Sequence, residues 1–131
     1  MYITLETDYA IRMVRQLLLT GKRMDARTLS KETDVSLRFA LKILGKLVSA
    51  GLIRSYTGIQ GGYETARGVS EISLYDVIEA IEGPYRISRC LDGEYCCPRN
   101  TGDVCRVHQV FEEINRDFSE RLRRTTFEQL L

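Results

Sequence analysis

The residues best suited to metal or redox chemistry in this sequence gather in one short segment. All four cysteines lie between Cys90 and Cys105, and the only histidine, His108, follows closely. Soft ligands distributed at random over the chain would not collect in this way. Glycine, proline and asparagine residues within the segment predict an irregular loop that can wrap around something small.

Composition limits the class of protein. A chain of 131 residues with 44% hydrophobic content fits one domain, or one small domain with an appended dimerisation arm. No run is long and apolar enough for a membrane span, and residues 1–8 lack the layout of a signal peptide. We therefore expect a cytoplasmic protein without a membrane partner, whose clustered cysteines are metal ligands or redox groups rather than structural disulfides.

The two halves of the chain differ in charge. Residues 1–68 hold eleven Lys and Arg against six Asp and Glu, whereas residues 69–131 hold eight against twelve, within a net charge of +1. A basic first half is what contact with a phosphate backbone requires.

Hydrophobic spacing predicts three helices in the first half. Thr7 is the expected cap of the first helix, Asp25 of the second, and Ser36 of the third, which ends near Gly51. The short break at residues 33–36 predicts the turn of a helix-turn-helix. The side chains expected on the buried side of the third helix are Phe39, Ala40, Ile43, Leu44, Leu47 and Val48.

A β-hairpin is predicted next. Residues 52–57 and 63–66 have the pattern of two strands, and the glycine-rich residues 58–62 form the turn between them. A helix-turn-helix followed by a hairpin is a winged helix. Its third helix enters the major groove of DNA, and its hairpin tip contacts the neighbouring backbone or minor groove. The predicted partner is therefore double-stranded operator DNA.

Candidate DNA contacts lie on the second helix, the third helix and the wing. Polar side chains near the start of the third helix point away from its apolar side, where they can reach base edges or phosphates. Glycines in the wing let its backbone approach DNA closely. The alternative is that the basic residues among the candidates are merely solvated. The candidates are Thr28, Ser36, Arg38, Lys42, Arg54, Thr57, Gln60 and Gly61.

Two further helices flank the cysteine segment. Ser73 caps a fourth helix that Gly83-Pro84 stops, and a long last helix begins at Asp103. Apolar residues of the last helix recur in steps of three and four, as in a heptad seam, which favours a homodimer over packing on its own domain. These residues are Val104, Val107, Phe111, Ile114, Phe118 and Leu122.

The predicted fold is mostly α with a small β-hairpin wing. It divides into a winged helix-turn-helix domain at residues 1–83, a cysteine-rich loop at 84–102, and a dimerisation helix with its tail at 103–131. Dimerisation suits a winged helix, because a dimer gains specificity by reading two half-sites.

Several motifs together resemble a known family. They are Asp8-Tyr9-Ala10, Val35–Phe39, Ala50–Ile53, Gly58–Tyr63, Ile72–Ile78 and the cysteine loop. With them the chain resembles the IscR/NsrR/RirA-type family of bacterial winged helix-turn-helix transcriptional regulators, which carry an iron–sulfur cluster loop. The resemblance covers nearly the whole chain. It implies a dimeric DNA-binding regulator that senses cluster supply, redox state or nitric oxide.

The resemblance also implies a ligand set. Three loop cysteines hold the cluster in this family, and Cys90 and Cys96, with five residues between them, match the usual first gap. Cys105 is the natural third ligand. The adjacent pair Cys96-Cys97 departs from the family pattern, so Cys97 is an alternative to Cys96.

The fourth ligand in this family is not a cysteine. His108 follows Cys105 closely and matches the histidine of one branch of the family. Asp8 matches a carboxylate that another branch supplies from the partner subunit. A 2Fe–2S cluster is favoured because of His108, and a 4Fe–4S cluster is possible.

Two other functions are weighed against this one. Cys90, Cys96, Cys105 and His108 also suit tetrahedral zinc, and Cys96 with Cys97 could form a thiol switch in the same fold. A small thiol-redox enzyme is disfavoured. The sequence contains no Cys-x-x-Cys, no nucleotide-binding glycine loop and no recognisable acid–base pair around the histidine. We therefore expect a regulator and not an enzyme.

Overall fold

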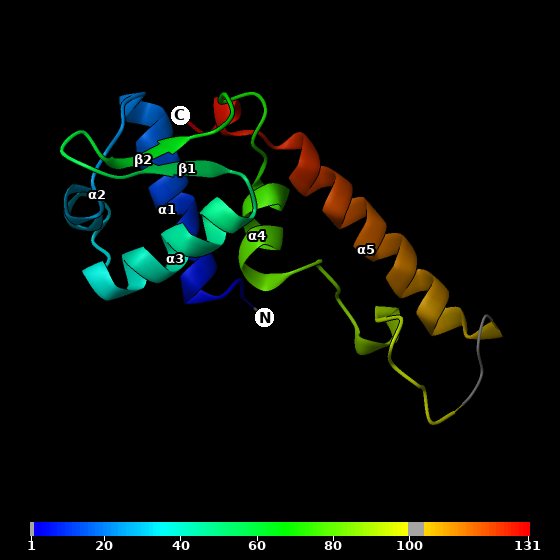
Figure 1. The fold of residues 1–131 in the computed structure, drawn as a ribbon. Coiled ribbons are helices and arrows are strands. Elements are labelled where there is room, and N and C mark those ends of the chain that lie inside the picture. The colour runs from blue at the N-terminus through cyan, green and yellow to red at the C-terminus, as the bar shows by residue number, and fades with distance from the viewer. Residues whose placement is uncertain (1, 100–103) are drawn as a thin grey trace.

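The computed structural model describes residues 2–99 and 104–131. Four helices and a two-stranded antiparallel hairpin form a head, and a long fifth helix leads away from it (Figure 1). The predicted fold class, mostly helical with a hairpin wing, is confirmed. The elements are α1 Leu5–Thr20, α2 Ala26–Thr33, α3 Leu37–Ser49, β1 Ile53–Tyr56, β2 Gly62–Thr65, α4 Leu74–Glu82, η1 Arg89–Leu91, α5 Arg106–Arg124 and η3 Phe127–Gln129.

Polar caps set the starts of the helices in the head. The expectation for α1 was wrong by one turn, because Thr4 and not Thr7 is its cap. The Thr4 hydroxyl accepts a hydrogen bond from the backbone N–H of Thr7. Thr7 is fully buried, and its own hydroxyl donates to the carboxylate of Glu82. The predicted caps of the next three helices are confirmed as Asp25, Ser36 and Ser73.

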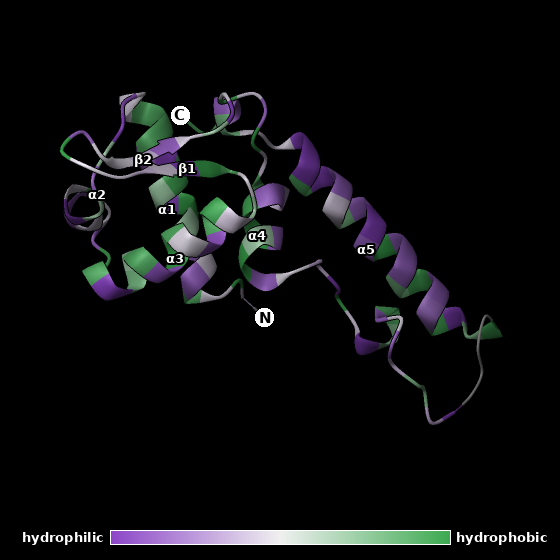
Figure 2. Cartoon of the chain, viewed as in Figure 1, coloured by the Kyte–Doolittle hydropathy of each residue, from purple (hydrophilic) through white to green (hydrophobic). Residues whose placement is uncertain are grey.

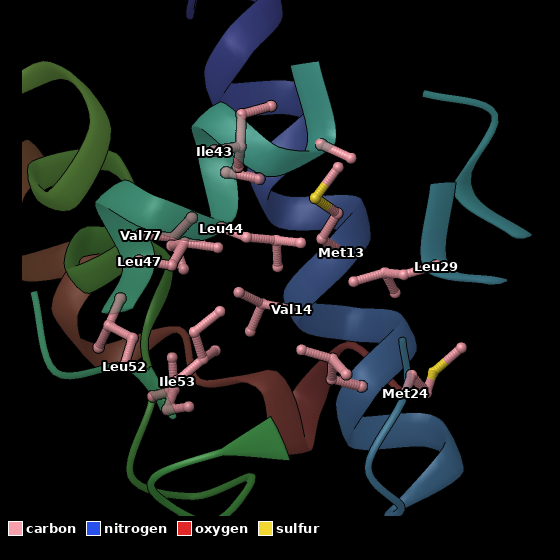
Figure 3. Close-up of a cluster of buried hydrophobic side chains, with 14 of the residues drawn as sticks. Met13, Val14, Met24, Leu29, Ile43, Leu44, Leu47, Leu52, Ile53 and Val77 are labelled. Atoms are coloured by element: carbon pink, nitrogen blue, oxygen red, sulfur yellow. The ribbon is translucent and has the colours of Figure 1, made fainter. Parts of the chain in front are cut away.

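A single core lies between α1, α3, α4 and the hairpin (Figure 3). Met13, Leu44 and Val77 are all fully buried there. Phe39 was wrongly predicted to lie in this core: 48% of it is exposed, and its ring makes a T-shaped contact with the Tyr9 ring. Phe39 directly precedes Ala40, the first buried residue of α3. Successive residues of a helix are rotated by about 100°, so the Phe39 side chain falls outside the packed face.

The wing is anchored to the segment between α1 and α2. In the hairpin, Ile53 pairs with Thr65 and Tyr56 with Gly62. Met24 and Tyr63 exchange two backbone hydrogen bonds, which extends the pairing beyond the hairpin. Gly62 has φ 138°, and a Cβ there would lie 2.6 Å from the carbonyl oxygen of Met24. Only glycine accommodates this approach.

The end of the chain returns to the head. The backbone N–H of Phe127 donates to the carbonyl of Ile72, and the N–H of Leu74 donates to the carbonyl of Thr125. The Phe127 side chain is fully buried in the core. Residues 125–130 therefore close the head beside α4, and hydrophobic spacing in the sequence did not predict this packing.

The cysteine segment lies beside the part of α5 that is farther from the head (Figure 1). Helix α5 begins at Arg106, and Asp103, its expected first residue, lies outside the described residues. The Asn115 side chain accepts from the N–H of Ile87 at 2.8 Å and donates to the carbonyl of Tyr85 at 3.1 Å. The Tyr85 ring also stacks at 4.9 Å on that of Phe118. These contacts hold the stretch that leaves α4 against α5.

The surface of α5 is mainly hydrophilic, with hydrophobic residues spaced along it (Figure 2). Among the described residues, no helix combines the length and hydropathy needed to cross a bilayer.

Candidate functional site

The turn between α2 and α3 is locked by local bonds. Asp34 ends α2 in the left-handed region, with φ 56°. Ser30 bonds to Val35 twice: its carbonyl accepts from the Val35 N–H, and its hydroxyl donates to the Val35 carbonyl. Val35 is only 4% exposed and belongs to the hydrophobic core, so its side chain also anchors the turn. These contacts fix the direction in which α3 leaves α2, as a helix-turn-helix requires.

The predicted contacts on α3 lie on its exposed side. Ser36 caps the helix by accepting a hydrogen bond from the N–H of Phe39 at 3.4 Å, and it remains exposed. Arg38 and Lys42 are four residues apart and both exposed, so they share one face of the helix.

Two apolar side chains share this outer surface and were missed as functional candidates. Phe39 and Leu41 are 48% and 47% exposed. Apolar side chains on a recognition helix can contact the methyl group of thymine in the major groove. Hydrophobic spacing placed Phe39 in the core because it adjoins the buried stripe. It left Leu41 outside that stripe, but an apolar side chain was not weighed as a DNA contact.

Thr28 is engaged in the cap of α2. Its N–H donates to one carboxylate oxygen of Asp25 at 2.9 Å, and its hydroxyl donates to the other at 2.8 Å. These bonds, led by the one from the backbone, lower the pKa of Asp25. The Thr28 hydroxyl is exposed and keeps lone pairs that can accept a bond, but its proton is directed toward Asp25.

The wing tip is exposed and tightly turned. Thr57 and Gln60 are both exposed, and the N–H of Gly61 donates to the carbonyl of Gly58. A Cβ at Gly61 would lie 2.6 Å from the carbonyl oxygen of Tyr56, so the turn requires glycine there. The wing therefore presents backbone as well as side chains to a partner.

Arg23 supports the wing and was missed by the sequence analysis. Its guanidinium donates to the carbonyl of Gln60 at 3.0 Å and lies 3.4 Å above the Tyr56 ring. It also lies 3.6 Å from the carboxylate of Glu64. The Tyr56 hydroxyl and then the charge of Arg23 lower the pKa of Glu64. Arg54, the other basic candidate on the hairpin, is exposed and pairs with Glu64 across the strands.

These candidates gather at one end of the head. Helix α2, the start of α3 and the tip of the hairpin lie on the side of the head away from α5 (Figure 1). The basic side chains of the candidate set, Arg38, Lys42 and Arg54, are exposed. The arrangement brings one helix, one loop and three exposed basic side chains to the same end of the head.

The cysteine segment lies elsewhere, beside the start of α5. Cys90 is half-buried in η1, with its sulfur 3.2 Å from the hydroxyl oxygen of Ser88. Cys96 and Cys97 are exposed, and Cys105 is half-buried directly before α5. Cys90, Cys96 and Cys97 are free thiols.

The fourth-ligand candidates lie in different parts of the fold. His108 is half-buried in the first turn of α5, whereas Asp8 lies in α1 and pairs with Arg12 at 2.7 Å. Across residues 2–99 and 104–131, no three His, Cys, Asp or Glu side chains are grouped so that they could hold a metal ion. The donors suit an iron–sulfur cluster or zinc by their chemistry alone, because cysteine thiolates and an imidazole are ligands that both use.

The helix-turn-helix with its anchored hairpin defines a winged-helix protein. The family model named Rrf2, described as an iron-dependent transcriptional regulator, matches residues 3–131. The chain therefore belongs to the Rrf2 family of transcriptional regulators. This assignment confirms the expected class: a DNA-binding regulator rather than an enzyme.

Individual relatives agree with the family assignment. Protein aau3 of Rhizobium meliloti (strain 1021) is 31% identical over 133 aligned positions, which cover all of this chain and 85% of that protein. The structure of CymR (YrzC), the global cysteine regulator of B. subtilis, covers 99% of this chain and 95% of its own, with TM-score 0.76 and 22% identity. T. potens IscR covers 99% and 85%, with TM-score 0.73 and 19% identity. At these identities, the two structures show a shared fold.

Proposed function

We propose that this chain is a dimeric transcriptional regulator that senses iron–sulfur cluster status, redox state or nitric oxide through its cysteine segment. One observation carries the proposal. The four cysteines follow the winged-helix head in the chain and lie beside the start of α5, the helix that offers a second copy an apolar face. A ligand held there would contact α5 at the end that lies away from the head (Figure 1).

The proposed DNA contacts follow from the exposed surface of the head. Arg38 and Lys42 approach the major groove from α3, with Ser36 at the start of that helix. The wing contributes Arg54, Thr57, Gln60 and Gly61, and Thr28 reaches a phosphate from α2. Backbone contacts position the head, and side chains on α3 read base edges.

The proposed dimer uses α5. Val107, Ile114 and Phe118 are 62%, 44% and 47% exposed, although they are large apolar residues on a regular helix. A second copy of the same helix would cover them. Two heads in one dimer would then read two half-sites of an operator.

The proposed cluster ligands are Cys90, Cys96, Cys105 and His108, with Cys97 and Asp8 as alternatives. When bound, the cluster supplies a centre that oxidants and nitric oxide can alter. Cluster binding can alter the position of α5 relative to the head, because the Asn115 side chain hydrogen-bonds α5 to the stretch after α4. A ligand acts as a signal only if it favours one arrangement of head and helix over another.

Anaerobic purification tests the proposal. We expect visible absorbance together with stoichiometric iron and acid-labile sulfide, and a change in DNA affinity when the cluster is removed. Material that stays colourless after reconstitution with iron and sulfide would contradict the cluster.

Single substitutions then assign the ligands. Cys96→Ser and Cys97→Ser form a matched pair, and we expect only the first to reduce iron content. The opposite result would give the ligand role to Cys97. His108→Ala and Asp8→Ala, compared by the cluster's absorption spectrum, decide between the two candidates for the fourth ligand.

A second candidate function keeps the fold and replaces the cluster. The chain shares its fold with CymR, the global cysteine regulator of B. subtilis. Zinc on the same ligands, or a thiol switch at the exposed Cys96 and Cys97, would also suit these side chains. Stoichiometric zinc without sulfide would favour the first of these, and a reversible disulfide that alters DNA affinity would favour the second.

A further inference from the structure

One carboxylate of α1 faces two lysines of α3. Glu6 lies 2.9 Å from the ammonium of Lys46 and 3.5 Å from that of Lys42, measured from the same oxygen, Oε1. That oxygen is shielded from solvent, and the Glu6 side chain is only 22% exposed. The carboxylate therefore sits within the junction between α1 and α3 and not on a freely solvated face.

The two lysines are held unequally. Lys46 has the shorter contact and a side chain that is 37% exposed, whereas Lys42 has the longer contact and is 58% exposed. The close contact with Lys46, followed by the charges of both lysines, lowers the pKa of Glu6, which keeps it ionised at neutral pH. Lys46 is its close partner, and Lys42 is the one that can swing away.

We propose that Glu6 is a positioning residue that restrains Lys42 and so limits the attraction of α3 for DNA phosphates. The inference rests on the proposed DNA contact at Lys42. A phosphate and the Glu6 carboxylate compete for the same ammonium, so Lys42 gives up one ion pair to make the other. Glu6 thereby sets how much sequence-independent affinity the recognition helix has, without touching DNA itself.

The salt dependence of DNA binding tests this role. Each phosphate contact contributes about 0.9 to the slope of log K against log salt concentration. We expect Glu6→Gln to bind a 30-base-pair duplex of mixed sequence more tightly than the unaltered protein, with a slope steeper by about 0.9. Its advantage should shrink about 3.5-fold between 50 and 200 mM KCl, measured by fluorescence anisotropy.

Two further variants separate this effect from general charge and from folding. Glu128→Gln makes the same change in net charge on an exposed residue outside α1 and α3 and should leave the slope unchanged. Adding Lys42→Ala to Glu6→Gln should remove the increase in DNA affinity. Glu6→Ala should show the same increase as Glu6→Gln. Thermal unfolding of each variant verifies that it is folded.

Two negative outcomes have different meanings. If the unaltered protein binds the duplex and Glu6→Gln has the same slope, Glu6 does not restrain Lys42 and the inference is overturned. The inference is also overturned if the gain persists in the double variant. If the unaltered protein does not bind duplex DNA at any of these salt concentrations, the proposed DNA-binding function itself fails.

Discussion

The Glu82 carboxylate joins two ends of the head through three hydrogen bonds to one oxygen. The Thr4 N–H and hydroxyl each donate to it at 2.8 Å, and the buried Thr7 hydroxyl donates as well. Partial burial of this carboxyl opposes its ionisation, but these bonds outweigh that effect and lower the pKa of Glu82. The start of α1 is thereby fastened to the end of α4, where the chain leaves for the cysteine segment.

We expect Glu82→Gln to lower the free energy of unfolding by about 1 kcal/mol at pH 7, because an amide accepts these bonds less strongly than a carboxylate. The folded pKa lies below the ordinary value of 4.5, so the carboxylate stabilises the fold above about pH 4.5. That stabilisation is lost as the pH falls through the folded pKa. Urea unfolding over a series of pH values from 7 downward should therefore show a difference between the two proteins that shrinks as the solution becomes more acidic.

The control for this experiment is Glu113→Gln, a change of the same chemistry on the exposed side of α5. It should alter stability by less than about 0.5 kcal/mol at any of these pH values. A Glu82→Gln variant as stable as the control at pH 7 would show that the three bonds contribute nothing net.

Among the elements, the wing depends on a residue outside it. Arg23 precedes α2, yet its guanidinium contacts the Gln60 carbonyl, the Tyr56 ring and the Glu64 carboxylate. A two-stranded hairpin is only marginally stable by itself. Arg23 and the Met24 backbone therefore support the wing from the side of the head.

We expect Arg23→Ala to loosen the wing tip without unfolding the head. Losing a cation–π contact and a hydrogen bond costs about 1–2 kcal/mol locally. Amide exchange at Gly61, whose N–H donates to the Gly58 carbonyl, should then become about 5–30 times faster. Arg23→Lys keeps the charge but not the planar guanidinium, so it should recover only part of the protection. Unchanged exchange in Arg23→Ala would rule out this support.

The tail is a second element whose role depends on packing. Phe127 is fully buried and its N–H donates to the carbonyl of Ile72, more than fifty residues earlier in the chain, whereas Leu131 is 45% exposed. We expect Phe127→Ala to destabilise the protein by about 3–5 kcal/mol in chemical denaturation, because it leaves a cavity in the core. Leu131→Ala should change stability by less than about 0.5 kcal/mol. Equal effects would show that the tail does not close the head.

At the scale of the whole molecule, α5 extends away from the head and carries apolar side chains that the chain itself does not cover (Figures 1 and 2). Its tail is nevertheless fixed in the core, so the helix is held at one end by the head and borders the cysteine segment at the other. This geometry gives the proposed second copy a long surface to pack against, and the same helix connects that surface to the cysteines and to the head that carries the proposed DNA contacts.

We expect Ile114→Glu to weaken the proposed dimer, since it would place a charge in the paired apolar face of α5. A tenfold or greater increase in the dimer Kd corresponds to about 1.4 kcal/mol or more. Analytical ultracentrifugation measures it. Glu112→Ala, on the same helix but already exposed and polar, should leave the dimer intact. A protein that sediments as a monomer before any substitution would contradict the dimer.

Much of the head could be predicted from sequence because its signals are local. Asp25, Ser36 and Ser73 were identified as helix caps from residue type and position, and the structure confirms each. The glycine-rich turn between two short strands likewise predicted the hairpin. The roles of the cysteines and of the DNA-facing residues remain predictions, since residue type and spacing suggest a partner that the fold of one chain does not test.

Only the tertiary structure decided which apolar residues are buried and which charges meet. Phe39 and Phe127 have similar chemistry, yet one lies half-exposed on α3 and the other lies in the core. Glu6 of α1 pairs with Lys42 and Lys46 of α3. These residues are too far apart in the sequence for a short-range pattern to predict the contact. Caps and turns are determined by interactions within a few residues. Burial and ion pairing depend on which distant segments pack together, and that depends on the free energy of the whole fold.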